Sequence, residues 1–303
     1  MLRCARCRLM WLDPQPAPES LPALYAGYCA PVQPKPQTLA RSLWQSARRG
    51  VLAAAYGYRE RAGAAESCFW HLVSAALPVK DVIGGTVQFV DGSRKGRLLD
   101  VGCGSGEFLA TMKSLGWTVE GVEFNPEAAR LAREAGGAPV FAGSLEDARL
   151  EDSSFDVVTL HHVIEHLPDP ARTLAECRRI LKDGGRIHIL TPNADSLGLR
   201  IFRRHWQALE VPRHLRIYSS ESIRKILAPA GFEIRILRST PRSAWLAWTA
   251  SRWLSRNDRL DRPVSSGLWT AFEGLLFHCV EHLLCLFRDC GEEILAVGVV
   301  KKT

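Results

Sequence analysis

The sequence predicts an α/β fold whose mostly parallel, doubly wound sheet carries helices on both faces. Between residues 96 and 190, short β-branched runs such as RLLDVG and FDVVTLHH alternate with amphipathic runs such as PEAARLAREAG. This alternation is typical of strand–helix–strand units, in which each crossover helix packs on a face of a parallel sheet. It resumes in SSESIRKILAPAGFEIRILRST, and the run EEILAVGVV supplies a closing strand.

The composition is that of one large globular domain with additions. The chain has 303 residues, of which 47% are hydrophobic and 23% are charged, so it can bury a sizeable core. Nine cysteines without framework spacing, and no apolar signal segment at the start, lead us to expect reduced thiols and a cytoplasmic protein. No apolar run reaches the length of about 18 residues that a membrane span needs. The formal charge of +7 suits anionic substrates, nucleic acid or a membrane surface and selects none of them.

Changes in composition along the chain predict five segments. An irregular arm rich in cysteine and proline precedes a helical segment whose pattern is broken at Pro78. The α/β core follows, and a stretch rich in tryptophan and leucine interrupts it before the last strand. The expected segments are the arm 1–36, the helical segment 37–95, the core 96–240, the hydrophobic helical insertion 241–290 and the closing strand 291–303.

The turn in LLDVGCGSGEFL, residues 98–109, indicates a ligand site. Gly102, Gly104 and Gly106 allow a tight turn and close approach of a ligand to backbone amides, and a helix begins just beyond them. The spacing differs from the G-x-G-x-x-G fingerprint of nicotinamide and flavin sites, so NAD is disfavoured. Glu123 is expected at the end of the next strand, where a carboxylate suits the two hydroxyls of a ribose. The ligand is therefore expected to contain adenosine.

Three ordered stretches together resemble a class I S-adenosylmethionine-dependent methyltransferase. They are LLDVGCGSGEFL, VEFNPEAARLAR and FDVVTLHHVIEHLPDPARTLAECRRILKDGGRIHILTPN. The runs CARCRLMWLDPQP and VPRHLRIYSSESIRKILAPAGFEI are similar to a bacterial group of small-molecule methyltransferases with an N-terminal cysteine-rich arm. The resemblance implies a seven-stranded, Rossmann-like sheet with helical additions, S-adenosylmethionine as the cofactor and methyl transfer as the activity.

The same resemblance implies which residues hold the cofactor. The first motif surrounds the methionyl part, Glu123 matches the ribose acid, and Phe124 flanks the adenine. Ser144 stands where the family commonly has an aspartate, and His161 lines the reactive end. The implied cofactor residues are Asp100, Gly102, Cys103, Gly104, Gly106, Glu123, Phe124, Ser144, Leu145 and His161.

Methyl transfer from a sulfonium needs alignment more than a protein nucleophile, but a hydroxyl or amine acceptor also benefits from a base. Histidine has a pKa suited to that task. The catalytic candidates are His161, His162, Glu165, His166 and His214. An equally weighted reading has Glu165 and His166 brace a loop. A metal held by those two would need further ligands, and we expect none.

The loop after residue 192 carries a cluster of basic residues. Guanidinium groups bind carboxylate or phosphate in a bidentate manner, so an acceptor with such a group is one interpretation. A solvated basic loop is the other, and it is preferred. The arginines concerned are Arg200, Arg203, Arg204, Arg213 and Arg216.

Cys4 and Cys7 have the C-x-x-C spacing of half a zinc site. Nothing in the spacing of Cys29 or Cys68 favours them as the other half. We therefore expect an arm without zinc.

The insertion 241–290 is rich in tryptophan and has a wide apolar arc in LWTAFEGLLFHCVEHLLCLF. Such helices either lie in a membrane interface, which would place the protein at the inner face of the membrane, or pack over the active site or a second subunit. The second interpretation is preferred. The oligomeric state is left open.

These observations predict a cytoplasmic methyltransferase that acts on a small molecule, such as a sugar, lipid or quinone-like intermediate, with O-methylation favoured. One alternative is a cofactor-binding interaction protein without catalysis. A nucleic-acid methyltransferase is less favoured, because the basic residues are dispersed and TPNA at 191–194 differs from an N-P-P-[YF] motif. Nucleic acid is therefore not expected as a partner.

Overall fold

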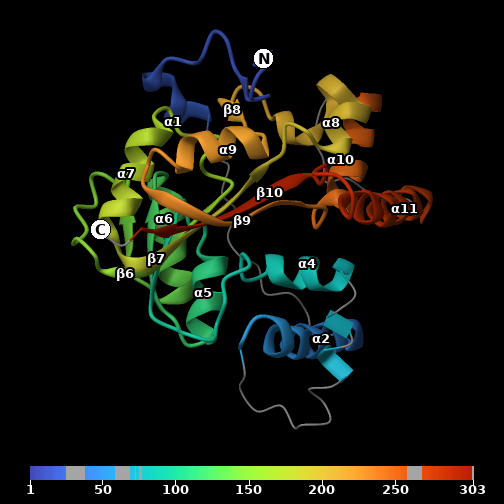
Figure 1. Ribbon diagram of the computed structural model, residues 1–303. Coiled ribbons are helices and arrows are strands. Elements are labelled where there is room, and N and C mark those ends of the chain that lie inside the picture. The colour runs from blue at the N-terminus through green and yellow to red at the C-terminus, as the bar shows by residue number, and fades with distance from the viewer. Residues whose placement is uncertain (25–37, 59–68, 72, 75–76, 258–267, 302–303) are drawn as a thin grey trace. The chain divides into compact units, whose positions relative to one another are not determined.

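The computed structural model in Figure 1 is divided into two compact units. Unit 1 comprises Met1–Leu24, His161–Arg178 and Ile189–Thr303, and unit 2 comprises Tyr25–Leu160 and Arg179–His188. The structure describes residues 1–24, 38–58, 69–71, 73–74, 77–257 and 268–301.

Seven strands form the main sheet, in the order β5-β4-β3-β6-β7-β10-β9. Parallel pairing joins β3 to β4 and β6, and β4 to β5, whereas β9 and β10 are antiparallel. This confirms the predicted seven-stranded, mostly parallel sheet. The bounds are β3 Arg97–Val101, β4 Thr118–Glu123, β5 Val140–Ala142, β6 Phe155–His161, β7 Leu181–Pro192, β9 Phe232–Thr240 and β10 Glu293–Val300.

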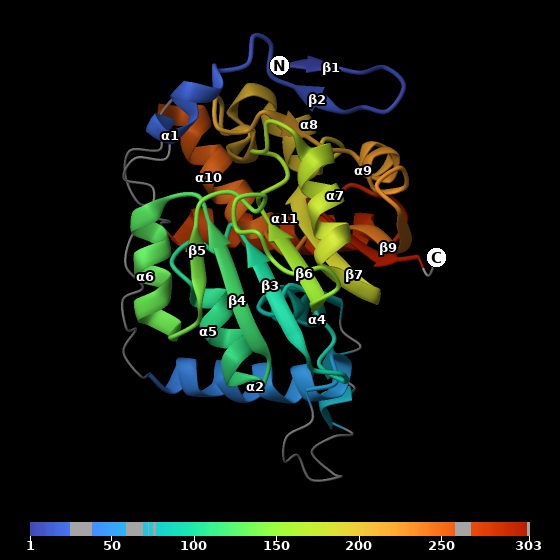
Figure 2. The ribbon, with the colours of Figure 1, turned by 90° about the vertical axis from the view of Figure 1, so that its left-hand side faces the viewer.

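The strand order reverses at β3. The chain runs outward from β3 to β4 and β5 and then returns to β6 on the other side of β3, as Figure 2 shows. Ligands of doubly wound sheets bind at the carboxyl ends of the strands at such a reversal. The glycine-rich turn follows β3 and therefore lies at this point of the topology.

Within the described part of unit 2, four helices have defined bounds, and local sequence explains the clearest of them. Asn125 caps α6 by accepting hydrogen bonds from the amides of Glu127 and Ala128, and Gly137 ends the helix in the left-handed conformation. Alanines of α6 form its buried face. The helices are α2 Leu39–Ala55, α4 Leu77–Gly85, α5 Glu107–Ser114 and α6 Pro126–Gly136.

In the sequence of unit 1, helices precede β9 and also separate β9 from β10. A capping box formed by Ser219 and Ser222 begins α9. The helices are α1 Leu21–Leu24, α7 Pro170–Ile180, which extends into unit 2 residues, α8 Leu197–Phe202, α9 Ser220–Leu227, α10 Ala244–Asn257 and α11 Leu268–Cys285. Short 3₁₀ turns are η1 Pro18–Ser20, η2 Arg203–His205 and η3 Gln207–Leu209.

A small antiparallel sheet holds the start of the chain within unit 1. It consists of β1 Leu2–Arg3, β2 Met10–Trp11 and β8 Arg216–Ile217. Arg3 pairs with Asp195 at 2.8 Å, and the Ser219 hydroxyl donates to the carbonyl of Cys7. Strands of two residues are too short to produce a period in the sequence, which is why the arm was expected to be irregular.

Helix α11 has an unusual distribution of side chains. Its acidic residues turn away from solvent, because Glu273 pairs with Arg252 of α10 at 2.7 Å and Glu281 is fully buried. Large apolar side chains at helical spacing face outward instead. This apolar face of α11 consists of Trp269, Phe272, Leu275, Leu276, Val280 and Leu283. Among the described residues, no helix combines the length and the apolar character that crossing a bilayer requires.

Candidate functional site

The turn after β3 is built from three glycines in the left-handed conformation. Gly102, Gly104 and Gly106 have φ values of 71°, 54° and 82°. L-residues with a Cβ adopt this region at a cost, so glycine is the natural choice at each position. The amide of Gly102 donates to the carbonyl of Val122 at 2.7 Å, which fixes the turn against β4.

The positions that a Cβ would take on these glycines have different surroundings. A Cβ on Gly106 would lie 2.8 Å from the Cα of Ala132, so α6 packs directly against this residue. A Cβ on Gly104 would meet nothing within 4 Å. Gly106 therefore serves packing, whereas the space beside Gly104 is open to a ligand.

Glu123, the last residue of β4, accepts hydrogen bonds with both carboxylate oxygens, one from the glycine turn and one from the start of the next segment. Its Oε2 accepts a hydrogen bond from the amide of Gly104, and its Oε1 accepts one from the amide of Asn125, both at 2.8 Å. The amide of Gly143 donates to the carbonyl of Glu123, which joins the segment after β5 to the same place. The structure thus brings Glu123 and Gly104 together, as the sequence predicted for a common site.

Asp100 is buried inside β3 and accepts a 2.6 Å hydrogen bond from the hydroxyl of Thr159 on β6. Burial raises the pKa of Asp100 to about 7, despite the opposing hydrogen bond from Thr159. Burial also raises the pKa of the neighbouring Cys103 thiol. Cys103 therefore stays protonated near neutral pH and is neither a nucleophile nor a metal ligand in this state.

The three other predicted adenine-site residues of unit 2 have distinct environments. Phe124 follows Glu123 and keeps 54% of its surface exposed. Ser144 donates to the Asp147 carboxylate at 2.6 Å and accepts from the amide of Asp147, while Leu145 is buried. Phe124 is thus an apolar ring open to solvent, and the Ser144 hydroxyl is engaged in its own turn.

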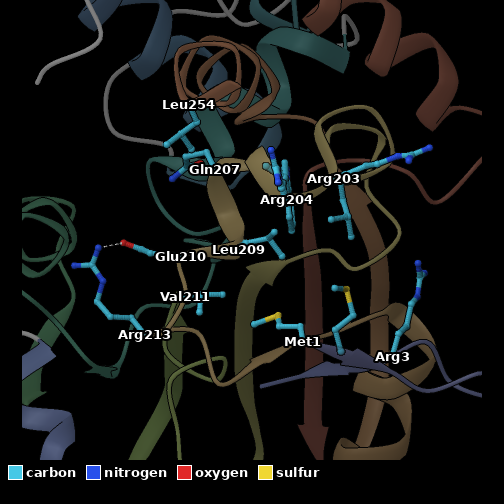
Figure 3. Close-up of a pocket in the computed structure, with 13 residues that line it drawn as sticks. Met1, Arg3, Arg203, Arg204, Gln207, Leu209, Glu210, Val211, Arg213 and Leu254 are labelled. Atoms are coloured by element: carbon cyan, nitrogen blue, oxygen red, sulfur yellow. Dashed lines mark ion pairs between the residues drawn. The ribbon is translucent and has the colours of Figure 1, made fainter. Parts of the chain in front are cut away.

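Unit 1 contains a cavity of about 780 Å³, and Figure 3 shows the residues that line it. Its wall is formed by residues 203–213, with contributions from Met1, Arg3 and Met10 at the start of the chain and Leu254 of α10. Three of the five arginines singled out in the sequence, Arg203, Arg204 and Arg213, line this cavity. Arg216 instead donates to the carbonyls of Leu167 and Pro168.

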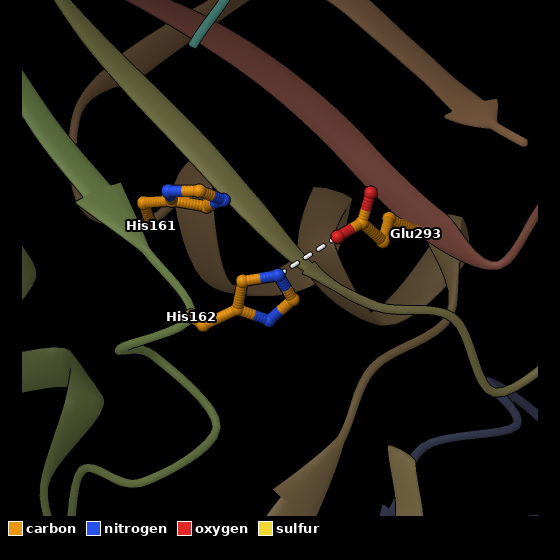
Figure 4. Close-up of side chains that lie close together, drawn as sticks. All are labelled: His161, His162 and Glu293. Carbon is orange, nitrogen blue, oxygen red and sulfur yellow. Dashed lines mark hydrogen bonds and ion pairs between the residues drawn. The ribbon is translucent and has the colours of Figure 1, made fainter. Parts of the chain in front are cut away.

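A compact network of charged side chains forms around the end of β6. His162 contacts Glu165 at 3.1 Å through Nδ1. Its Nε2 lies 2.8 Å from Glu293, as Figure 4 shows by a dashed line. Arg242 donates to Glu293 and to Nε2 of His161, at 2.7 and 2.8 Å respectively. Glu293 begins β10 and Arg242 follows β9, so two of these five residues come from distant parts of the chain.

The adjacent histidines of this network have opposite protonation preferences. Burial opposes the charged form of His162, but the hydrogen bonds that its ring donates to Glu165 and Glu293 outweigh burial and raise the pKa of His162 to about 10. Burial and the cations His162 and Arg242 lower the pKa of His161 well below its usual value. Near neutral pH His162 is therefore a cation, and His161 is neutral and accepts from Arg242 at Nε2.

Glu165 is fully buried and shared between two partners. Burial would raise the pKa of this carboxyl, but the hydrogen bond with His162 and the charges around it lower the pKa to about 2. Its second oxygen accepts from the hydroxyl of Thr191 at 2.9 Å. Glu165 is therefore an anion at every pH near neutrality, and it orients His162.

His166 and His214 form a second pair, with ring centroids 4.6 Å apart. The Nδ1 of His166 donates to the carbonyl of Arg213, and the Nδ1 of His214 donates to that of Ala208. The Nε2 of His214 lies 3.2 Å from Glu210. Burial lowers the pKa of His166, so near neutral pH this ring is neutral, with its proton on Nδ1 and its basic nitrogen at Nε2.

Among the residues that the structure describes, two groups of three side chains have the composition and proximity of metal ligands. They are His161, His162 and Glu293, and Glu165, His166 and His214, with ligand atoms within 4.8 Å of one another in each group. His214, which the sequence did not place beside Glu165 and His166, completes the second group. Within the first group, the ion pair between His162 and Glu293 already occupies two of the ligand atoms.

In the arm, Cys4 and Cys7 are free thiols. Cys29 and Cys68, which were considered as additional ligands, lie outside the described residues. The expectation of an arm without zinc stays a prediction.

Several curated proteins are similar to this chain, and the three described here share one name. The chain is 34% identical over 142 residues to a ubiquinone biosynthesis O-methyltransferase of Thiobacillus denitrificans, which covers 44% of this chain and 59% of that protein. It is 38% identical over 103 residues to the Xanthomonas oryzae pv. oryzae protein of the same name, covering 32% and 43%. A third such protein, from Paracidovorax citrulli, is 29% identical over 211 residues, covering 66% and 84%. The chain thus spans about half the length of the first two relatives.

Among solved structures, a possible histamine N-methyltransferase of Thermotoga maritima is 22% identical, with a TM-score of 0.49. The match covers 86% of this chain and all of that one.

A family model described as a methyltransferase domain matches residues 80–236, just over half of the chain. The match includes the turn after β3, Glu123 and the histidines at the end of β6. The resemblance to methyltransferases is thereby confirmed, whereas the similarity to a group with an N-terminal cysteine-rich arm stays a prediction. The chain belongs to the methyltransferase domain family.

Proposed function

We propose that this protein transfers a methyl group from S-adenosylmethionine to a hydroxyl group of a small molecule with a quinone-like ring. The observation that carries the proposal is the contact between Glu123 and the amide of Gly104, which sets a carboxylate beside the open side of a glycine turn. Membership of the methyltransferase domain family supports methyl transfer, and the relatives' name, O-methyltransferase, supports oxygen as the methylated atom.

The residues of unit 2 fit this cofactor. Glu123 offers a carboxylate to the ribose hydroxyls, the space beside Gly104 leaves room for the methionyl part, and the exposed ring of Phe124 offers an apolar face to the adenine. Asp100, in β3, and Cys103, in the turn itself, are buried. When bound, S-adenosylmethionine supplies a methyl group on a sulfonium that is its own leaving group.

We assign to His166 the role of the base that accepts the proton of the acceptor hydroxyl. This ring is neutral near pH 7, and its donation from Nδ1 to the carbonyl of Arg213 makes Nε2 the basic nitrogen. His162 is unsuited to the role of base because it already carries a proton. Its cation is held by Glu165 and Glu293, which leaves it an electrostatic and orienting role beside neutral His161.

The experiment that tests the proposal measures transfer of a labelled methyl group from S-adenosylmethionine to a panel of catechols and hydroquinones. We expect incorporation into at least one acceptor by the wild type and its loss in Glu123→Ala. Binding of S-adenosylhomocysteine without transfer to any acceptor would favour a cofactor-binding protein without catalysis. A folded wild type that binds neither form of the cofactor would contradict the proposal altogether.

We also propose that the protein is cytoplasmic and contacts the inner face of the membrane through the apolar face of α11. Trp245 and Trp269 are 49% and 70% exposed, and tryptophan is favoured at the headgroup level of a bilayer. Arg256 and Arg288 are exposed at the ends of α10 and α11, where they can pair with anionic lipid. Such a location would bring the enzyme to an apolar acceptor.

A further inference from the structure

The cavity of unit 1 has the size of a site for a small organic ligand. Its volume of about 780 Å³ lies within the range of about 300 to 1,000 Å³ that is typical of small-molecule sites. Residues far apart in the unit 1 sequence, from Met1 to Leu254, contribute to its wall (Figure 3). The cavity is therefore a product of tertiary packing rather than a local gap in one loop.

The polar part of the wall carries an excess of positive charge. Arg3 pairs with Asp195 at 2.8 Å, and Arg213 pairs with Glu210 at 2.5 Å. Arg203 and Arg204 also line the cavity, and within the described part of the chain neither is in an ion pair with a carboxylate. Two guanidinium groups are thus available to a carboxylate or phosphate, which they can bind in a bidentate manner.

The rest of the wall is apolar. Met10, Leu199 and Leu209 line the cavity and pack against the cluster of buried residues formed by Ala194, Trp206 and Ile217. A hydrocarbon or aromatic body would lose contact with water against these side chains. The lining therefore combines an apolar surface with adjacent cationic groups.

The backbone holds part of this wall in unusual conformations. Arg203 and Glu210 have φ values of 51° and 37°. Side-chain-bearing residues pay a cost in this region, and such residues concentrate at functional sites. Glu210 is also fixed through its carboxylate, which contacts both Arg213 and His214.

The cavity wall is in direct contact with the histidine pair. The carbonyl of Arg213 accepts from His166 at 3.1 Å, and Glu210 contacts His214 at 3.2 Å. All four residues belong to unit 1. Arg213 would therefore lie between a ligand in the cavity and the ring of His166, which is assigned as the base.

We propose that this cavity binds an amphipathic anion, which has an apolar body and a carboxylate or phosphate that pairs with Arg203 and Arg204. The identification of this anion as the methyl acceptor rests on the proposed function, whereas the binding of the anion does not. The acceptor would then carry an acidic group as well as the hydroxyl that is methylated. Arg203 and Arg204 act as residues that position the acceptor.

The binding part is tested by titration calorimetry of the full chain with octanoate, octyl phosphate, octanol and inorganic phosphate. We expect both amphipathic anions to bind more tightly than octanol and inorganic phosphate. The doubly substituted Arg203→Gln, Arg204→Gln variant should lose at least about tenfold in affinity for the anions, because each charged hydrogen bond contributes more than a neutral one. Comparison of octanoate with octyl phosphate identifies which acid the site prefers.

Arg200→Gln is the matched control, because Arg200 is an exposed arginine of α8 that does not line the cavity. It should bind the anions like the wild type, and both variants should bind S-adenosylhomocysteine unchanged. Octanol binding as tightly as octanoate, or equal affinities in the double variant and Arg200→Gln, would overturn the anion site.

The acceptor part is tested with 3,4-dihydroxycinnamate and its methyl ester, which share the catechol and differ in charge. The double variant should lower the preference in kcat/KM for the acid over the ester by about tenfold or more, mainly through KM. An unchanged preference would overturn the acceptor assignment. Transfer to neither compound, with octanoate still bound, would count against the proposed function and leave the anion site standing.

Discussion

The backbone amide of Gly104 donates a 2.8 Å hydrogen bond to Oε2 of Glu123, so the turn after β3 and the end of β4 are joined by a side chain. Glu123 accepts a second hydrogen bond of the same length from Asn125, whose side chain caps α6. One carboxylate therefore links the glycine turn, a strand end and a helix start. Any ligand that donates hydrogen bonds to Glu123 also affects the geometry of the turn.

Substitution of Glu123 should weaken cofactor binding while leaving the fold in place. Glu123→Ala removes the carboxylate proposed for the ribose and frees the amide of Gly104. We expect at least about a tenfold loss of affinity for S-adenosylhomocysteine in titration calorimetry, since two charged hydrogen bonds are lost. Glu127→Gln, which changes an exposed acid on the adjacent helix, is the control and should bind as the wild type does. Equal affinities in the two variants would remove Glu123 from the site.

Two glycine substitutions should separate stability from binding. Gly106→Ala places a Cβ 2.8 Å from the backbone of Ala132 and should cost about 1 to 3 kcal/mol for overpacking in addition to the strain of a positive φ. Gly104→Ala meets open space, so only the strain of about 1 kcal/mol is expected in the free protein. Urea denaturation measures the first effect. Calorimetry measures the affinity of each variant for the cofactor. Relative to the stability that each variant loses, Gly104→Ala should lose more affinity than Gly106→Ala. The reverse order would show that the cofactor does not use the open space beside Gly104.

His162 should stabilise the protein in a manner that depends on pH. Its pKa is raised to about 10 in the folded state, so its contribution is complete below its unfolded value of about 6.5 and is lost as the pH rises through 10. Glu165, whose pKa is lowered to about 2, contributes fully above its unfolded value of about 4.3 and loses this contribution as the pH falls through 2. Both contributions are therefore complete between about pH 4.3 and 6.5.

His162→Gln tests this dependence. The variant should lose about 2 kcal/mol of unfolding free energy near pH 6, less than for a fully buried pair because the His162 side chain is 38% exposed and Arg242 still neutralises Glu293. Thermal denaturation of the variant and the wild type between pH 6 and 10 should show the difference shrinking toward the alkaline end. A difference that is constant with pH would mean that His162 is not protonated in the folded protein.

If His166 is the base, the pH dependence of the rate should change with it. Burial lowers the pKa of His166, so kcat/KM of the wild type should fall only as the pH drops below about 6.5. His166→Gln should reduce kcat by about a hundredfold or more and remove this acid limb. A variant with reduced kcat and an unchanged acid limb would assign a structural role to His166, the alternative that the sequence left open for the Glu165–His166 pair.

Membrane contact through α11 can be measured by co-sedimentation with vesicles. Vesicles that contain anionic lipid should retain the wild type, and the double variant Leu276→Ser, Leu283→Ser should bind several-fold more weakly, since two large apolar side chains leave the interface. Ile201→Ser, an exposed apolar residue of α8, is the control. A different outcome would assign this face to a second copy of the chain: the wild type does not bind vesicles and is a dimer, and the Leu276→Ser, Leu283→Ser variant is a monomer.

The sequence predicted the parts of the protein whose signal is local. The glycines after β3, the carboxylate at the end of β4 and the alternation of strands and helices all follow from short-range chemistry. The network around His162 could not be predicted in full, because Glu293 and Arg242 reach it from β10 and the end of β9 through tertiary packing. The protonation states of His161 and His162, which are adjacent in sequence, likewise depend on partners that no spacing reveals.

The pairing of β2 with β8 carries a consequence for how the chain is made. Met10 and Trp11 are synthesised before the core, but their partners Arg216 and Ile217 are synthesised only after most of it. The arm therefore stays undocked until β8 has been made, and Met10, which lines the cavity, is placed at a late stage of folding.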